Sequence, residues 1–322
     1  MEYGMEASTP VQESNTASFW RRIGALVIDG VFLAGIGFGL GLLFESWFVS
    51  LGDAARLVGF SIALIYFGVM NSELGKGQTL GKQALNLKVV DSRGEFISPL
   101  RSFARYTIFA IPFYLNNLSL SPETLSNSVV LPYLLSFIIF GGIFSTTYLY
   151  IFNKRTRQTL HDLIVDTYVI QSEGVFNSSA SIWKPHLAIV ALISLVSVVA
   201  VSVMSEKVNE EPFSAMLATQ SEILKVSPIR TASVTHNQRF VTSSSEGSKS
   251  FEFVNVRAVL TENEIADKEL SKTLSDIVFS YYPNSREVNA VNVTLSYGYD
   301  IGIWSSWSHE THSYNFTDSM SQ

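Results

Sequence analysis

Long apolar stretches alternate with short polar segments over the first 204 residues of the chain. A membrane-spanning helix needs about 20 mainly apolar residues. The four stretches that meet or approach this length lie at 23–49, 57–74, 129–152 and 184–204. A fifth stretch, 102–118, is shorter and contains Arg105 and Pro112. The pattern therefore predicts four helices that cross a membrane and a fifth segment that either crosses or lies at its surface.

The distribution of basic residues favours five crossings. Lysine and arginine collect at cytoplasmic loops, and they cluster here at Arg21 and Arg22, within 75–105 and within 153–184. All three clusters reach one side only if 102–118 also crosses. The segment 116–128 has no lysine or arginine, as an outside loop should. We expect a cytoplasmic amino terminus and an extracytoplasmic carboxyl terminus, and a re-entrant or interfacial 102–118 is the alternative.

Period-two alternation predicts a small sheet between the helices. Residues 84–98 alternate apolar and polar positions around a turn at 91–94, which is typical of a β-hairpin. A further short strand is expected at 166–171. These three strands are each too short to be stable alone, so we expect them to pair beneath the bilayer on its cytoplasmic side.

The carboxyl-terminal third predicts a separate α+β domain at 251–322. Residues 172–183 look like a linker, and 205–250 look like a polar connecting segment. A strand is expected at 251–260, and Thr261 with Glu264 suggests a capping box that begins a helix ending near Tyr282. Unbroken alternation over 291–303 predicts a long strand, and one more is expected near 308–316. The predicted fold class is thus a membrane helical bundle of about five spans with a three-stranded sheet, followed by a soluble α+β domain.

Composition supports this division and excludes several functions. The chain is 47% hydrophobic and only 16% charged. Its net charge of −6 comes entirely from 205–322, because 1–204 holds equal numbers of acidic and basic residues. An acidic outer domain argues against nucleic-acid binding. There is no cysteine, which excludes disulfides and thiolate metal sites. Residues 1–18 are polar and acidic, so we expect no cleaved signal peptide.

Motifs for catalysis or metal binding do not reach the spacing that their chemistry needs. The run GKGQTLGKQ at 75–83 has too few residues between its glycines for a phosphate-binding loop. His161 and Asp162 lack a third metal ligand at useful spacing, and so do His309 and His312. No serine lies in a G-x-S-x-G turn. We expect no enzymatic activity, no cofactor and no metal.

Two groups of side chains suggest contacts rather than chemistry. Glycines 35, 37, 39 and 41 form overlapping GxxxG pairs, which let backbones approach closely in a membrane. Packing against another span of the same chain is favoured over a dimer seam. Trp304, Trp307, Tyr314 and Phe316 cluster late in the chain, and core packing is favoured over binding of a partner, glycan or lipid headgroup.

Three blocks, taken together and in order, resemble the RDD family of bacterial membrane proteins. They are FWRRIGALVIDG, GQTLGKQALNLKVVDSRGEFIS and RQTLHDLIVDTYVI, within residues 18–171. The family is named for one arginine and two aspartates, which correspond here to Arg22, Asp29 and Asp162, with Arg21 as the rival arginine. The resemblance implies a location in the bacterial inner membrane. Transport of an unidentified ligand is the function usually suggested for the family.

Asp29 is the most informative single residue, because an ionised carboxylate inside a bilayer costs about 2.5–3.5 kcal/mol on insertion scales. It must therefore face protein or water. Arg22 lies about 10 Å away along the helix axis, so direct pairing is not expected. The expected partners of Asp29 are Arg105 or Lys82, or, for a protonated Asp29, a backbone or Ser/Thr acceptor. We expect Arg22 to meet Asp162 instead.

Two functions follow from these residues. The first is transport of an ion or small solute, with Asp29 as a protonatable or cation-binding site. The second is a membrane anchor or assembly protein that presents its outer domain to a protein partner, with Asp29 as a structural clamp. The expected partners are the lipid bilayer and either another copy of the chain or another membrane or extracytoplasmic protein. The sequence alone does not choose between the two functions.

Overall fold

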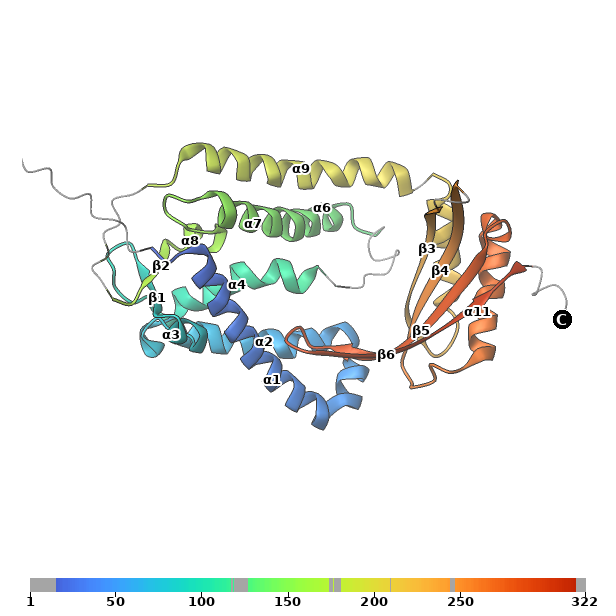
Figure 1. Ribbon diagram of the computed structural model, residues 1–322, viewed down its shortest axis with the longest axis horizontal. Helices are drawn as coiled ribbons and strands as arrows, with labels where there is room; N and C mark the ends of the chain where they lie inside the picture. The colour runs from blue at the N-terminus through green and yellow to red at the C-terminus, as the bar shows by residue number, and fades with distance from the viewer. Residues whose placement is uncertain are drawn as a thin grey trace, which may run out of the picture. The chain divides into compact units, whose positions relative to one another are not determined.

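The computed structural model describes residues 16–116, 118, 127–173, 176, 181–208, 210–243 and 247–316 (Figure 1). The chain divides into two compact units, each built from three separate segments. The first unit comprises Met1–Phe32, Ile62–Phe113 and Phe140–Ser194. The second comprises Leu33–Ser61, Tyr114–Ile139 and Leu195–Gln322. Helices α1 and α2 contribute to both units, and each unit is described below by itself.

Within the described residues, three helical stretches are long and apolar enough to cross a membrane. The first, Phe19–Met70, consists of α1 (Phe19–Leu51), a 3-10 turn at Gly52–Ala55 and α2 (Arg56–Met70). The second, Val130–Phe152, consists of α6 (Val130–Ser136), a π-helical turn at Phe137–Gly141 and α7 (Gly142–Phe152). The third is α9 (Lys184–Val208). This number is smaller than the five spans predicted.

Helix α4 (Pro99–Leu115) accounts for part of the difference. It has 17 residues, which is fewer than the roughly 20 that a membrane-spanning helix needs. Its buried positions include Ser102, Arg105 and Tyr106. The helix therefore forms as predicted, but its length and polar buried face keep it out of the candidate spans. Part of the predicted outer loop 116–128 lies outside the described residues.

The sequence predicted three strands in the small sheet, but the structure has two. Strands β1 (Leu87–Asp91) and β2 (Thr167–Gln171) pair antiparallel, with Val89 opposite Val169. Residues 95–98 are not a strand, because the Asp91 carboxylate accepts hydrogen bonds from the N–H groups of Arg93 and Glu95 and turns the chain. Instead, Ala17 N–H donates to the Val169 carbonyl, and Thr16 bridges to Ile170.

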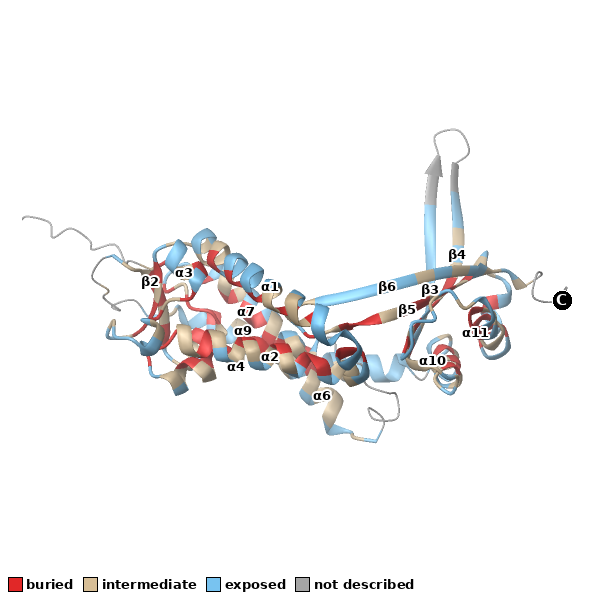
Figure 2. Cartoon of the chain, turned by 90° about the horizontal axis from the view of Figure 1, so that it is seen from below, coloured by how far each residue is buried: buried red, intermediate tan, exposed pale blue. Residues whose placement is uncertain are grey.

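The carboxyl-terminal residues form a mixed sheet of four strands in the order β3-β4-β5-β6. The strands are β3 (Ile229–Ser243), β4 (Gly247–Leu260), β5 (Ala290–Asp300) and β6 (Ser305–Tyr314). Strands β4 and β5 are parallel, and the other neighbours are antiparallel. Helix α11 (Lys268–Tyr281) connects β4 to β5, and its buried side chains share one core with α10 (Phe213–Ile223) and the sheet (Figure 2).

Two sequence predictions for this region need correction. The segment 205–250, expected to be a polar connection, contains α10 and β3. Helix α11 begins after Asp267, whose carboxylate accepts from the N–H groups of Glu269 and Leu270. Thr261, the predicted cap, donates its hydroxyl to the Pro228 carbonyl instead. Burial of alternating positions on β5 agrees with the predicted long strand.

The glycines of α1 have an intramolecular partner, which is the β5–β6 turn rather than another span. A Cβ on Gly37 would lie 2.6 Å from the Cβ of Trp304. A Cβ on Gly59 of α2 would collide with the Ile301 carbonyl. Gly35 and Gly39 have nothing within 4 Å of their added Cβ atoms. One face of the glycine run therefore receives the turn, within the second unit.

Candidate functional site

The first unit contains a short sequence repeat that the sequence analysis did not use. Gln-Thr-Leu occurs at residues 78–80 and again at 158–160, 80 positions later. Each copy precedes a five-residue helix, α3 (Leu80–Ala84) or α8 (Leu160–Ile164), and each helix leads directly to β1 or β2. The repeated threonines are the two N-caps. The repeat therefore marks two copies of one helix–strand motif.

Matching contacts confirm the structural equivalence. The Gln78 side-chain amide donates to the Leu87 carbonyl at 2.8 Å, and Gln158 donates to the Thr167 carbonyl at 3.0 Å. A left-handed residue ends each helix: Asn86 at φ 53° and Asp166 at φ 49°. Val89 and Val169, which occupy equivalent positions in the repeat, face each other in the register of β1 and β2. The two motifs are thus related by an approximate twofold axis.

Asp29 of α1 closes the amino-terminal turn of α3. Its carboxylate is 1% exposed and accepts a 2.8 Å hydrogen bond from the Gly81 N–H. Tyr66 and Thr79 donate their hydroxyls to it at 2.7 and 2.6 Å. Each hydroxyl also accepts a backbone N–H of α3, from Leu80 and Lys82 respectively. The first three N–H groups of α3, which have no partner inside the helix, are therefore all satisfied directly or through a hydroxyl.

Three groups donate hydrogen bonds to the side chain of Asp29: the Gly81 N–H and the hydroxyls of Tyr66 and Thr79. Among the described residues, no lysine or arginine forms an ion pair with Asp29. The expected Arg105–Asp29 pair does not form. Hydroxyl and backbone groups do contact Asp29, but they donate to it, whereas acceptors were expected for a protonated acid.

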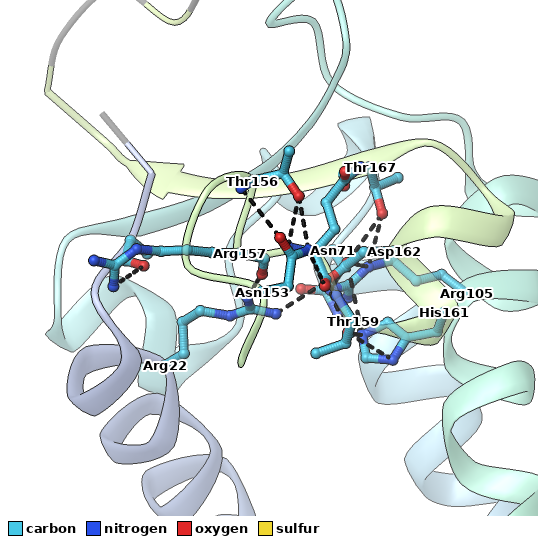
Figure 3. Close-up of polar contacts among 12 residues, drawn as sticks. Arg22, Asn71, Arg105, Asn153, Thr156, Arg157, Thr159, His161, Asp162 and Thr167 are labelled. Carbon is cyan, nitrogen blue, oxygen red and sulfur yellow. Dashed lines mark hydrogen bonds and ion pairs between the residues drawn. The ribbon is translucent and has the colours of Figure 1, made fainter. Parts of the chain in front are cut away.

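Asp162 is the counterion of two arginines, as Figure 3 shows. Arg22 donates from Nη2 to Oδ2 at 2.9 Å, as the sequence analysis expected. Arg105 donates from Nε and Nη2 to Oδ1 at 2.9 and 2.7 Å. Thr159 and Thr167 also donate to the carboxylate. Helices α1, α4 and α8 are held together at this single buried side chain.

The charges around Asp162 shift neighbouring protonation equilibria. Burial alone would raise the pKa of Asp162, but the positive charges of Arg105 and Arg22 outweigh it and hold the pKa well below its usual value. Burial lowers the pKa of His161 to about 3, and Arg105 adds to this effect. His161 is therefore neutral near pH 7, so its ring can accept a hydrogen bond from Arg105 Nη2 at 3.3 Å.

Lys82 occupies the position in α3 that Asp162 occupies in α8. Its ammonium group donates to Asn71 Oδ1 at 2.7 Å. Burial, followed by the nearby Arg105 charge, lowers the pKa of Lys82 from 10.5 to about 7. Lys82 can therefore gain or lose a proton near neutral pH. The sequence analysis named it only as a partner for Asp29.

A cavity of about 90 Å³ brings these groups together inside the first unit. Its polar lining includes Arg22, Asp29, Asn71, Lys82, Arg105 and His161. A second cavity of about 280 Å³ is lined by Ala17, Asn153 and Arg157 among others. Arg22 and Tyr150 line both cavities, and the guanidinium of Arg22 lies 5.1 Å from the centre of the Tyr150 ring. The arginine–tyrosine pair therefore separates the two spaces.

The structure brings all five sequence-predicted residues into this region. Arg22, Asp162 and Arg105 form one cluster, while Asp29 and Lys82 lie at α3 and face the same cavity. The sequence analysis missed Tyr66, Asn71 and Thr79. The repeated Gln-Thr-Leu would have identified Thr79 as an N-cap. Within the described residues, no three acidic or histidine side chains form a group that could hold a metal ion.

The part of the chain that builds the site is also the part that resembles known proteins. Residues 16–166 match the model of the RDD family. The chain is also similar to the uncharacterized protein YckC of Bacillus subtilis, with 24% identity over 153 residues. That match covers 48% of this chain and 83% of YckC. The arginine and both aspartates of the family signature lie within the matched range. The match to the RDD family therefore covers the residues that build the site.

Proposed function

We propose that the RDD domain transports a small ion across the membrane and that the cavity beside Lys82 is its binding site. The observation that carries this proposal is a lysine with a near-neutral pKa in a charged cavity of a membrane domain. Ionisable groups inside membrane domains are costly and commonly mark ion or proton pathways. A purely structural contact needs no group that titrates near neutral pH.

The charge balance of the cavity favours an anion. Its described lining contains three cationic side chains, Arg22, Lys82 and Arg105, and one carboxylate, Asp29. Asp162 adds a second carboxylate in contact with the two arginines. With His161 neutral, the group carries one positive charge when Lys82 is protonated and none when it is not. Protonation of Lys82 therefore attracts an anion, and deprotonation releases it.

The dimensions restrict the ion and indicate how it enters. A space of about 90 Å³ admits a few waters or a small inorganic or carboxylate anion. The adjoining space of about 280 Å³ offers an approach to it. In this proposal, movement of the Arg22–Tyr150 pair connects the two cavities. Asp29 positions α3, and thereby Lys82, rather than carrying the ion.

The test is anion flux into proteoliposomes that contain the full chain. Uptake of chloride, nitrate, acetate and phosphate is measured with and without an inwardly directed proton gradient. Lys82→Met should abolish proton-dependent uptake, whereas Lys82→Arg should leave a site that no longer responds to pH. Lys76→Met is the matched control, because Lys76 is exposed in the same turn and lines neither cavity. Equal flux in the parent protein and Lys82→Met would contradict the proposal.

Anchoring or assembly is the second candidate, and one observation favours it. Asp29 is buried with three hydrogen-bond donors, as a structural clamp requires. Under this alternative, the membrane helices only hold the four-stranded domain for a protein partner. Absence of any flux in the parent protein, together with loss of stability in Asp29→Asn, supports the anchor over the transporter. Neither candidate assigns a catalytic step to the chain.

We also propose the orientation that the basic clusters suggest. Placing Arg22, the α3 turn and the 153–184 cluster at the cytoplasmic face puts the small sheet on that side. This orientation needs α4 to cross the membrane as well, although α4 is shorter than the candidate spans, and the four-stranded domain is then extracytoplasmic. The distribution of lysine and arginine supports this orientation.

A further inference from the structure

The second unit has a cavity of its own, with a volume of about 700 Å³. It lies between the Gly52–Ala55 turn, which joins α1 to α2, and strands β3 and β4. We propose that this cavity binds the phosphate group of an anionic ligand. Its volume is in the range of small-molecule sites, which is about 300–1,000 Å³. The inference does not depend on the transport proposal, because no residue is shared with the cavity beside Lys82.

Arg230 supplies the first argument. Its Nη1 donates to the Val49 carbonyl at 2.7 Å, which fixes the guanidinium against the end of α1. Its Nε is shielded from solvent and has no hydrogen-bond acceptor. Gly52, at φ +57°, leaves room for the side chain, since a Cβ there would lie 3.3 Å from Arg230 Cδ. A shielded guanidinium N–H without an acceptor at a cavity wall calls for an anionic or carbonyl oxygen.

The remaining charges leave the cavity cationic. Arg56 and Arg257 also line it, and so do two carboxylates, Asp53 and Asp300. Asp300 lies 3.7 Å from Arg56 and accepts the Gly302 N–H at 2.6 Å, so it is directed toward its own turn. Arg257 forms no ion pair with any described residue. Three guanidinium groups and two carboxylates leave one positive charge for a ligand to neutralise.

Phosphate is the group that fits these donors best. Guanidinium groups bind phosphate through paired N–H donors, with more geometric specificity than a lysine provides. The hydroxyls of Thr231 and Ser233 line the same cavity and can donate to phosphate oxygens. The Gly52–Ala55 turn joins α1 to α2 inside the first apolar stretch, Phe19–Met70. With α1 and α2 as two separate crossings, as the sequence predicts, this turn lies at the membrane surface, where lipid headgroups are. The phosphate can therefore belong to an anionic phospholipid or to a soluble phosphate ester, and the lipid is the expected source.

The experiment measures binding to the delipidated full chain in detergent by native mass spectrometry. The probes are phosphatidylglycerol, diacylglycerol without phosphate, and glycerol 3-phosphate. Phosphatidylglycerol should bind, and loss of one charge-assisted hydrogen-bonding group should weaken it about tenfold or more. Arg257→Gln tests this at an exposed position, and Arg230→Gln tests it at the shielded one. Arg239→Gln is the control, because Arg239 is exposed on β3 and does not line the cavity.

The outcomes show whether a phosphate site exists and, separately, which kind of molecule carries the phosphate. Binding of phosphatidylglycerol alone, weakened in both variants, identifies a lipid site. Equal binding of glycerol 3-phosphate, with the same dependence on the two arginines, identifies a soluble ester and leaves the phosphate site standing. The proposal is overturned if diacylglycerol binds as tightly as phosphatidylglycerol. It is also overturned if Arg257→Gln and Arg230→Gln both bind like the parent protein.

Discussion

The carboxylate of Asp29 in α1 accepts a 2.8 Å hydrogen bond from the backbone N–H of Gly81 in α3. This contact ties the first apolar helix to the helix–strand motif that also carries Lys82. A Cβ on Gly81 would collide with the Ala25 carbonyl, so the close approach of the two backbones needs glycine. Substitutions at Asp29, Gly81 and Lys82 can therefore test the stability of the domain separately from its function.

Asp29→Asn should destabilise the domain even though it keeps the side-chain shape. The amide presents an NH₂ group where the carboxylate presents an oxygen, so at least one of the three donors loses its acceptor. An unsatisfied buried donor costs about 1–3 kcal/mol. A fall in the melting temperature of the detergent-solubilised protein is the expected result. Glu45→Gln, an exposed change in the same helix, should leave it unchanged. An equal melting temperature for Asp29→Asn and parent protein argues against the clamp.

Asp162 and its partner Arg105 should behave as one unit. Asp162→Asn leaves two buried guanidinium groups without a counterion and should cost about 3–5 kcal/mol. Arg105→Met should also destabilise, because Asp162 keeps only Arg22. In the double variant the two losses overlap, so the total should be less than their sum. Chemical denaturation of all four proteins measures this coupling. Strictly additive losses would show that the two side chains act independently.

Stability should depend on pH through Lys82, whose pKa is lowered from 10.5 to about 7 in the folded protein. Between these two pH values, the unfolded chain binds a proton at Lys82 that the folded protein does not. Stability therefore rises with pH from about 7 to 10.5, and below about 7 the destabilisation from this group is complete and constant. Lys82→Met removes this contribution. The difference in melting temperature between Lys82→Met and parent should shrink from pH 7 toward pH 10, and a constant difference would falsify the assignment.

Gly81→Ala should weaken the packing of α3 on α1. The added Cβ meets backbone atoms of Ala25, which cannot rotate away as a side chain can. Overpacking of this kind costs about 1–3 kcal/mol. Gly30→Ala is the matched control, since a Cβ at Gly30 has nothing within 4 Å. The melting temperature should fall in Gly81→Ala and stay near that of the parent protein in Gly30→Ala. A fall in melting temperature for both would point to a general effect of replacing glycine in this region.

The proposed orientation predicts that the two ends of the structure face different compartments. One reporter is inserted in the β1 turn at 91–94, and another is attached after residue 322. Alkaline phosphatase, which is active only outside the cytoplasm, should work at the second position and fail at the first. A cytoplasmic reporter should give the opposite result. Activity of one reporter at both positions would reject the orientation.

Several features were readable from the sequence because they depend on local spacing. Apolar length identified the helices that became α1, α2, α7 and α9, and period-two burial identified β5. Helix geometry argued against Arg22 as the partner of Asp29, and the family resemblance singled out Asp162, with which Arg22 forms a 2.9 Å ion pair. The helix and strand assignments and the exclusion of an Arg22–Asp29 pair need only the periodicity of one element or the rise along one helix.

Other features depended on how distant segments pack. Arg105 was expected at Asp29 but lies against Asp162, because α8 brings the Asp162 carboxylate to it and β2 brings the Thr167 hydroxyl. The predicted strand at 95–98 was lost because the Asp91 side chain caps the turn, and the Glu73 N–H binds the Ile97 carbonyl instead. The sequence by itself thus determined the membrane helices, the family and the Arg22–Asp162 pair. The tertiary structure decided the partners of Asp29 and the place of Lys82 in a charged cavity. The contacts of Asp29 join residues 37 to 52 positions apart, and no local pattern records them.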